Sequence, residues 1–170
     1  MKKLILVPFL IALACLLAAG MGAAQNQLTY GISPSWFHDW KFEHFAIPEA
    51  LHGRLGASLV GVLATWWMGL ILSVVLLGVC LFARSAGAMA GLFIQSAVLV
   101  VLITALAEFG AWIWGLYRFG PETVPGWASF FEDPVAAARV EFINFTGYCA
   151  APAGTLAAVG RAMLRLRRVG

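Results

Sequence analysis

Residues 55–83, LGASLVGVLATWWMGLILSVVLLGVCLFA, run without a single Asp, Glu, Lys, Arg or His, and they decide the fold of this chain. A helix needs roughly 20 apolar residues to cross the hydrocarbon core of a bilayer, and this stretch exceeds that length. Three further stretches, 4–37, 85–107 and 142–160, lack the same five residue types. Because the membrane interior offers no water to backbone groups, such spans are helices. The sequence therefore predicts an all-α membrane protein with up to four transmembrane helices.

The composition also indicates that lipid is part of the solvent. Of the 170 residues, 62% are hydrophobic and 11% are charged, whereas soluble domains average about 25% charged residues. The net charge of +3 arises near the two ends of the chain, so it is interpreted as an orientation signal and not as a nucleic-acid footprint. The lipid bilayer is the predicted environment, and no nucleic acid is predicted as a partner.

The expected architecture is a single membrane domain, 1–170, whose helices form a compact bundle. The approximate spans are 4–24, 57–83, 88–117 and 136–163, and the outer loops are 25–56 and 118–135. The second span carries small residues at four-residue spacing, namely Ala57, Gly61, Thr65, Gly69 and Ser73. Small residues let helix backbones approach closely in lipid. This row therefore predicts a helix-packing face, and it is compatible with self-association.

The first apolar stretch has two interpretations. Lys2 and Lys3 precede an apolar run over 4–17, and small residues follow before a polar turn, which is also the pattern of a secretory signal peptide. Cleavage after Ala24 would leave three spans, whereas retention of the segment as a signal anchor gives four. Both alternatives stay open on the sequence alone.

The distribution of charge predicts the orientation. All eight acidic residues lie in two stretches, 39–49 and 108–141, whereas seven of the eleven basic residues gather at the N-terminus, at Arg84 and in the tail 161–168. Loops on the cytoplasmic side carry an excess of Lys and Arg. We therefore expect the N- and C-termini to be cytoplasmic, with the acidic stretches on the outer (periplasmic) side of the inner (plasma) membrane.

The first outer loop is rich in aromatic residues, and two structures would explain this. Between 36 and 45, Trp and Phe residues alternate with His, Asp, Lys and Glu, and Ser33-Pro34 is a favourable helix start. One interpretation is a short amphipathic helix lying on the membrane surface. The other is a lid over a pocket at the helix ends. An exposed aromatic surface would also suit a protein partner.

The same loop contains candidate metal ligands. They are His38, Glu43, His44, Glu49 and His52. Glu49 and His52 have the Glu-x-x-His spacing of di-metal helix bundles, which need two such motifs. Histidine and carboxylate ligands together suit zinc or iron. The alternative is a solvated interfacial loop, and no cofactor is predicted.

Glu108 is the most suggestive single residue because it interrupts an otherwise apolar span. An ionisable group within a span is a functional hypothesis by default. A helix count from the inner anchors places Glu108 near the outer membrane edge, at the depth of Asn144 and Arg139. Arg54 or Arg139 would be able to pair with it. Three roles stay open, namely a structural ion pair or solvated group, a proton or ion pathway, and a ligand contact.

The sequence contains no glycine-rich phosphate loop, HExxH, G-x-S-x-G or CxxCH motif, so no catalytic residue is predicted. The leading hypothesis is a non-enzymatic interaction or accessory protein that acts through its outer face on another membrane protein or a second copy. The alternative is a small transporter or membrane enzyme with an outward-facing polar or metal site around Glu108, His44, His52 and Arg54. A deep cavity at Glu108 would favour the alternative.

Overall fold

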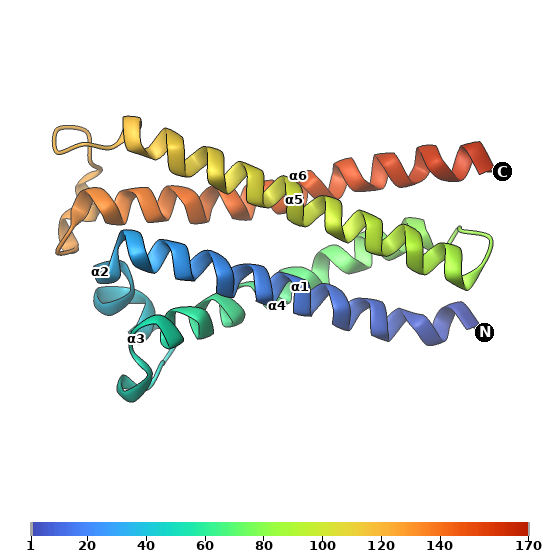
Figure 1. The fold of residues 1–170 in the computed structure, drawn as a ribbon, viewed down its shortest axis with the longest axis horizontal. Helices are drawn as coiled ribbons and strands as arrows, with labels where there is room; N and C mark the ends of the chain where they lie inside the picture. The colour runs from blue at the N-terminus through green and yellow to red at the C-terminus, as the bar shows by residue number, and fades with distance from the viewer. Residues whose placement is uncertain (1, 170) are drawn as a thin grey trace.

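The computed structural model describes residues 2–169 of the chain. Within this range all regular structure is helical and there is no strand. The elements are α1 (Lys2–Ile32), α2 (Pro34–Trp36), the π-helix η1 (Phe37–Lys41), α3 (Phe42–His44), the 3-10 helix η2 (Glu49–Leu51), α4 (Arg54–Cys80), α5 (Ala86–Arg118), the 3-10 helix η3 (Gly126–Phe130) and α6 (Pro134–Val169). Figure 1 shows α1, α4, α5 and α6 extended along the longest axis of the molecule.

Three of the long helices, α1, α4 and α5, are long and apolar enough to cross a membrane. This agrees with the prediction of an all-helical membrane protein. The predicted fourth span, 136–163, lies within α6, which is not among these three. The first half of α6 contains polar side chains such as Glu141 and Asn144, and its end is rich in arginine, so its composition alone does not identify it as a span.

The first helix is longer than predicted. Residues 25–32 were expected to belong to the outer loop, but α1 continues without a break to Ile32. Polar side chains of this extension form hydrogen bonds to a neighbouring helix instead of facing solvent. The amide Nδ2 of Asn26 donates to the carbonyl oxygen of Ala57 on α4 at 3.0 Å. Thr29 is also buried. The extension is therefore a packed part of α1.

Helices α1 and α4 form the closest pair in the molecule. A Cβ atom added at Gly69 would lie 2.5 Å from the carbonyl oxygen of Ala14, so the two backbones touch there. One turn earlier on α4, the hydroxyl of Thr65 donates to the carbonyl oxygen of Ala18 at 2.8 Å. The predicted helix-packing face of small residues on the second span is confirmed, and its partner is α1.

Helices α5 and α6 form the second close pair, and contacts between the two pairs are fewer. A Cβ added at Gly154 of α6 would be 3.3 Å from the side chain of Ile103 of α5. Both ends of the described chain lie at the end of the bundle that holds the turn after α4 (Figure 1). There the ammonium of Lys3 donates to the carbonyl oxygens of Leu81 and Ala83. The short helices α2 and α3 lie at the opposite end.

The helices α2, η1 and α3, which we call the aromatic lid, pack onto that opposite end. Trp36, Phe37 and Phe42 are exposed by only 2%, 1% and 0% of their surface. They form one apolar cluster with the start of α4 and with Phe131 and Val140 near the start of α6. A membrane-surface helix would leave such rings facing lipid. The packing therefore favours the interpretation of the segment as a lid.

Candidate functional site

A cavity of about 240 Å³, which we call the chamber, lies between the two helix pairs. Its lining changes character along the bundle. Toward the turn after α4 the lining is apolar and includes Leu72, Leu76, Ala97, Val100 and Val101. Toward the aromatic lid, polar side chains join the rings of Trp36, Phe37 and Trp40, and they are Gln25, Asn26, Lys41, Glu108, Glu141 and Asn144. The chamber is therefore amphipathic along its length, with its polar half under the lid.

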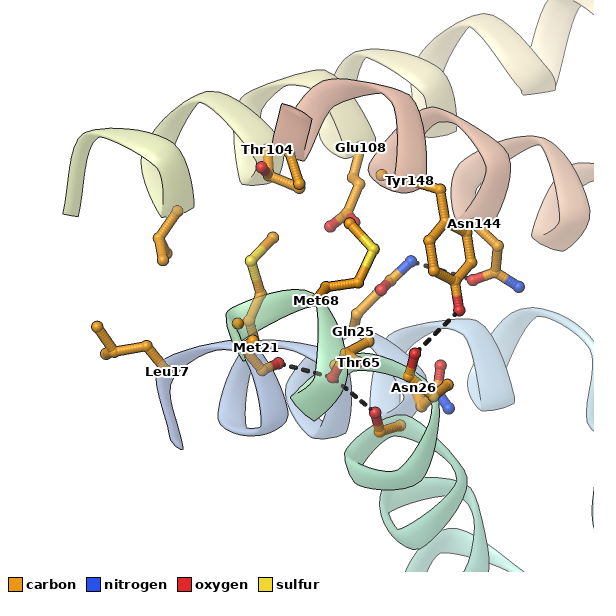
Figure 2. A pocket seen from close by; sticks show the side chains of 18 of the residues that line it. Leu17, Met21, Gln25, Asn26, Thr65, Met68, Thr104, Glu108, Asn144 and Tyr148 are labelled. Carbon is orange, nitrogen blue, oxygen red and sulfur yellow. Dashed lines mark hydrogen bonds between the residues drawn. The ribbon is translucent and has the colours of Figure 1, made fainter. Parts of the chain in front are cut away.

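Glu108 lies in the polar half of the chamber. Figure 2 shows its carboxylate directed from α5 into the space between the helix pairs. The room for this side chain comes from Gly147 of α6, where an added Cβ would be 3.1 Å from the carboxyl carbon of Glu108. One turn below, Thr104 is buried and donates its hydroxyl hydrogen to the carbonyl oxygen of Val100 at 2.9 Å. Helices α5 and α6 can thus pack closely at this position because Gly147 leaves space for the carboxylate of Glu108.

Two side-chain hydrogen bonds join the helix pairs at the level of Glu108. The amide Nε2 of Gln25 on α1 donates to Oδ1 of Asn144 on α6 at 3.0 Å. The phenol of Tyr148 on α6 donates to the carbonyl oxygen of Ala64 on α4 at 3.3 Å (Figure 2). These bonds fix the spacing of the two pairs, so the polar half of the chamber has a defined shape.

The outermost part of the chamber is bounded by the lid. The ammonium of Lys41 lies 3.8 Å from the ring centroid of Trp40 and 5.5 Å from that of Trp36, which is cation–π geometry. Burial lowers the pKa of Lys41 below its ordinary value, and the negative charge of Glu141 acts in the opposite direction. Lys41 and Glu141 thus form an interacting pair of opposite charge, and both residues line the chamber.

Of the predicted ligand residues, the structure brings Glu108 and Asn144 together and places the two arginines elsewhere. Arg139 donates to the carbonyl oxygen of Phe119 at 3.0 Å. Arg54 donates to the carbonyl oxygen of Gln27 at 3.2 Å. Both guanidinium groups therefore serve helix ends and loops, and neither arginine lines the chamber.

The predicted metal ligands do not converge. All five of them, His38, Glu43, His44, Glu49 and His52, are exposed. The ring of His52 stacks on Phe42 at 4.3 Å, and its Nε2 lies 3.0 Å from the carbonyl oxygen of Ile47. Across residues 2–169, no group of three or more His, Cys, Asp or Glu side chains is placed to hold a metal ion. The histidines act instead as members of the aromatic packing around the lid.

Sequence reasoning missed several chamber residues. Gln25 was assigned to a loop because it follows the first apolar run, but the extension of α1 brings it opposite Asn144. Lys41 and Glu141 are distant in sequence, and they influence each other electrostatically only because the lid folds back over the start of α6. Gly147 belongs to a row of small residues on α6, which indicates a helix contact but does not identify Glu108 as the group that it accommodates.

Comparisons of the chain with family models, with curated proteins and with solved structures give no match. A functional conclusion therefore rests on the chamber, its lining and the surface around it.

Proposed function

We propose that this chain is a multi-pass inner-membrane protein whose chamber binds an amphipathic small molecule from the outer side, without catalysing a reaction on it. The observation that carries this proposal is the change from an apolar to a polar lining along one cavity. Binding sites for small molecules are typically concave and mostly apolar, with a few polar groups that orient the ligand. The polar head of the ligand would lie beside Glu108, and its apolar tail would lie along Leu72 and Val101.

The proposed membrane arrangement places all four long helices across the bilayer, with α6 as the fourth span. The support is that α6 packs along α5, which is a candidate span. If α6 did not cross the bilayer beside α5, this face of α5 would have no partner helix. The end of the bundle with both chain ends and the turn after α4 is basic, and the lid end holds the acidic residues. The basic end is the cytoplasmic one by the distribution of Lys and Arg.

This topology predicts opposite labelling of two engineered cysteines. In a variant whose three natural cysteines are replaced by serine, Glu122→Cys in the loop after α5 should react with a membrane-impermeant maleimide added to intact spheroplasts. Ser85→Cys, in the turn after α4, should react only after the membrane is opened. Labelling of Ser85→Cys in intact spheroplasts would contradict the proposed orientation.

A binding chamber is favoured over a lid-mediated docking surface by the burial of the lid aromatics. Trp36, Phe37 and Phe42 face inward, so they are not available to a protein partner. A smaller outer surface remains at Trp127 and Phe130, which are 48% and 69% exposed. Docking of another membrane protein or of a second copy on this surface is the second candidate function, and it is compatible with a ligand in the chamber.

Filling the apolar half of the chamber should abolish binding of an amphiphile. We expect Val101→Trp to raise the dissociation constant for decanol by about tenfold or more, because excluding two methylene groups removes about 0.8 kcal/mol each. The matched control is Val98→Trp, since Val98 is on the same helix and faces outward. Native mass spectrometry of the purified variants in dodecyl maltoside measures the bound fraction. Equal binding by both variants would contradict a ligand in the chamber.

A further inference from the structure

We propose that the amphipathic ligand of the chamber carries a protonated amine as its head group, and that this amine binds the carboxylate of Glu108. The inference rests on the proposed function, because it names the head group of the same ligand. It follows from three features of the polar half of the chamber, namely the balance of charge, the balance of hydrogen-bond donors and acceptors, and the position of the apolar half.

The charges that line the chamber do not cancel. Among its described lining residues there are two carboxylates, Glu108 and Glu141, and one ammonium, that of Lys41. Lys41 lies over the Trp40 ring and interacts electrostatically with Glu141. A half-buried carboxylate is costly without a counter-charge. The lining therefore has one carboxyl group more than it has cations, and a cationic ligand at Glu108 would supply the missing counter-charge.

Neighbouring cations do not supply that counter-charge. Arg139 and Arg54 bind the carbonyl oxygens of Phe119 and Gln27, and neither lines the chamber. The carboxylate of Glu108 instead packs against Gly147 of α6 and faces the chamber between the helix pairs. A ligand is therefore the source of positive charge that this geometry admits.

The hydrogen-bonding groups around Glu108 favour a donor head group. The amide nitrogen of Gln25 donates to Asn144, which leaves its amide oxygen as an acceptor in the lining of the same chamber. The hydroxyl hydrogens of Thr104 and Tyr148 are donated to backbone carbonyl groups. An ammonium group has three donors and no acceptor. It would thus donate to the carboxylate of Glu108, whereas an anionic head group would be repelled by the negative charges of Glu108 and Glu141.

The apolar half of the chamber requires that the amine carry a tail. Ala97 lines the chamber about 16 Å below Glu108 along α5, at 1.5 Å rise per residue. Leu76 of α4 lines the same end. An alkyl chain that follows the helices from an amine at Glu108 would therefore lie against apolar side chains. A long-chain primary amine is the class of ligand that matches both halves.

The test compares three ligands that share a decyl chain and differ in the head, namely decylamine, decanol and decanoate, with butylamine as a short-chain arm. Dissociation constants are measured in dodecyl maltoside for the natural protein, Glu108→Gln and the control Glu122→Gln, whose carboxyl group lies in the loop outside the chamber. Each ligand partitions into the micelle equally whichever variant is present. Ratios between variants therefore report the protein alone.

We expect the natural protein to bind decylamine most tightly, and Glu108→Gln to weaken decylamine binding about tenfold or more while decanol binding is unchanged. Tenfold corresponds to about 1.4 kcal/mol, which is in the range expected for a charge-assisted hydrogen bond. Unchanged decanol binding shows that the variant is folded with its chamber intact. The control Glu122→Gln should bind all of the ligands as the natural protein does.

The possible failures separate the two proposals. Equal loss of decylamine and decanol in Glu108→Gln, no loss of decylamine, or tightest binding of decanoate would each overturn the amine head group while the chamber still binds an amphiphile. If butylamine bound as tightly as decylamine, the amine head group would be supported, but the requirement for an apolar tail would be contradicted. Absence of binding by all three decyl ligands would overturn the proposed function itself.

Discussion

Replacing Gly69 with leucine is expected to force α1 and α4 apart and to cost the protein a large part of its stability. The first atom of any side chain at this position would lie 2.5 Å from the carbonyl oxygen of Ala14 and 2.7 Å from the Cα of Cys15. These are backbone atoms, which do not move aside as the end of a side chain does. Overpacking costs about 1–3 kcal/mol, and occasionally more. We expect the upper part of that range here.

The measurement is the loss of monodisperse protein on heating in dodecyl maltoside, followed by size-exclusion chromatography. The matched control is Gly78→Leu. Gly78 is on the same helix, and an added Cβ there meets nothing within 4 Å. The Gly78→Leu variant replaces another glycine of α4 without contacting α1, so its stability should equal or exceed that of the natural protein. Equal stability of the two variants would mean that α1 and α4 do not approach as closely as this geometry requires.

The sequence was informative about these helices because packing in lipid leaves a residue-level signature. A row of small residues at four-residue spacing allows the backbone of another helix to approach closely. Gly61 and Gly69 therefore indicated the packing face without any knowledge of the partner. The partner, α1, was not identified from the sequence, although Ala14, Ala18 and Gly22 of α1 have the same four-residue spacing and Gly22 meets Gly61.

The chamber could not be predicted, because a cavity leaves no such signature in the residue types. A cavity depends on how far two helix pairs stand apart, and no single residue type records a distance. Glu108 was correctly singled out as an unusual residue, but its surroundings depend on the extension of α1 that brings Gln25 into the bundle. They also depend on Gly147, whose significance becomes clear only when α6 is laid against α5.

The histidine-rich loop could be interpreted from the sequence either as a metal site or as a solvated loop, for a physical reason. Histidine is both a metal ligand and a flat ring, and only the fold decides which property is used. Here His38 and His52 both contact the ring of Phe42, at 5.0 Å and 4.3 Å between centroids. The rings of these residues pack against Phe42 of the lid, and the carboxylates of Glu43 and Glu49 are exposed.

Replacing Trp36 with alanine is expected to open the chamber as well as to destabilise the lid. Trp36 stacks on Phe131 at 4.9 Å and packs edge-on against Trp40 at 4.8 Å, and it lines the chamber. Truncation of a buried aromatic side chain to alanine typically costs about 3–5 kcal/mol. Because the lid lies at the end of the bundle, we expect the helices to persist while the outer wall of the chamber is lost.

Access to the chamber is the readout that separates this opening from general unfolding. In a background without the natural cysteines, Thr104→Cys places a thiol on the buried chamber wall. Its reaction with a membrane-impermeant maleimide should be slow beneath the natural lid and at least several-fold faster when Trp36→Ala is added. Trp127→Ala is the matched control, because Trp127 is half-exposed and does not line the chamber. Equal labelling rates with and without Trp36 would show that the lid does not cover the chamber.

A second substitution at the same position tests which property of Trp36 matters. Its indole Nε1 is buried and has no hydrogen-bond partner among the described residues. An unsatisfied buried donor is destabilising, so Trp36→Phe should keep most of the ring stacking and remove that cost. We therefore expect Trp36→Phe to retain slow labelling of Thr104→Cys and a stability close to that of the natural protein. Fast labelling in Trp36→Phe would instead assign the closure of the chamber to the indole nitrogen and its edge of the ring.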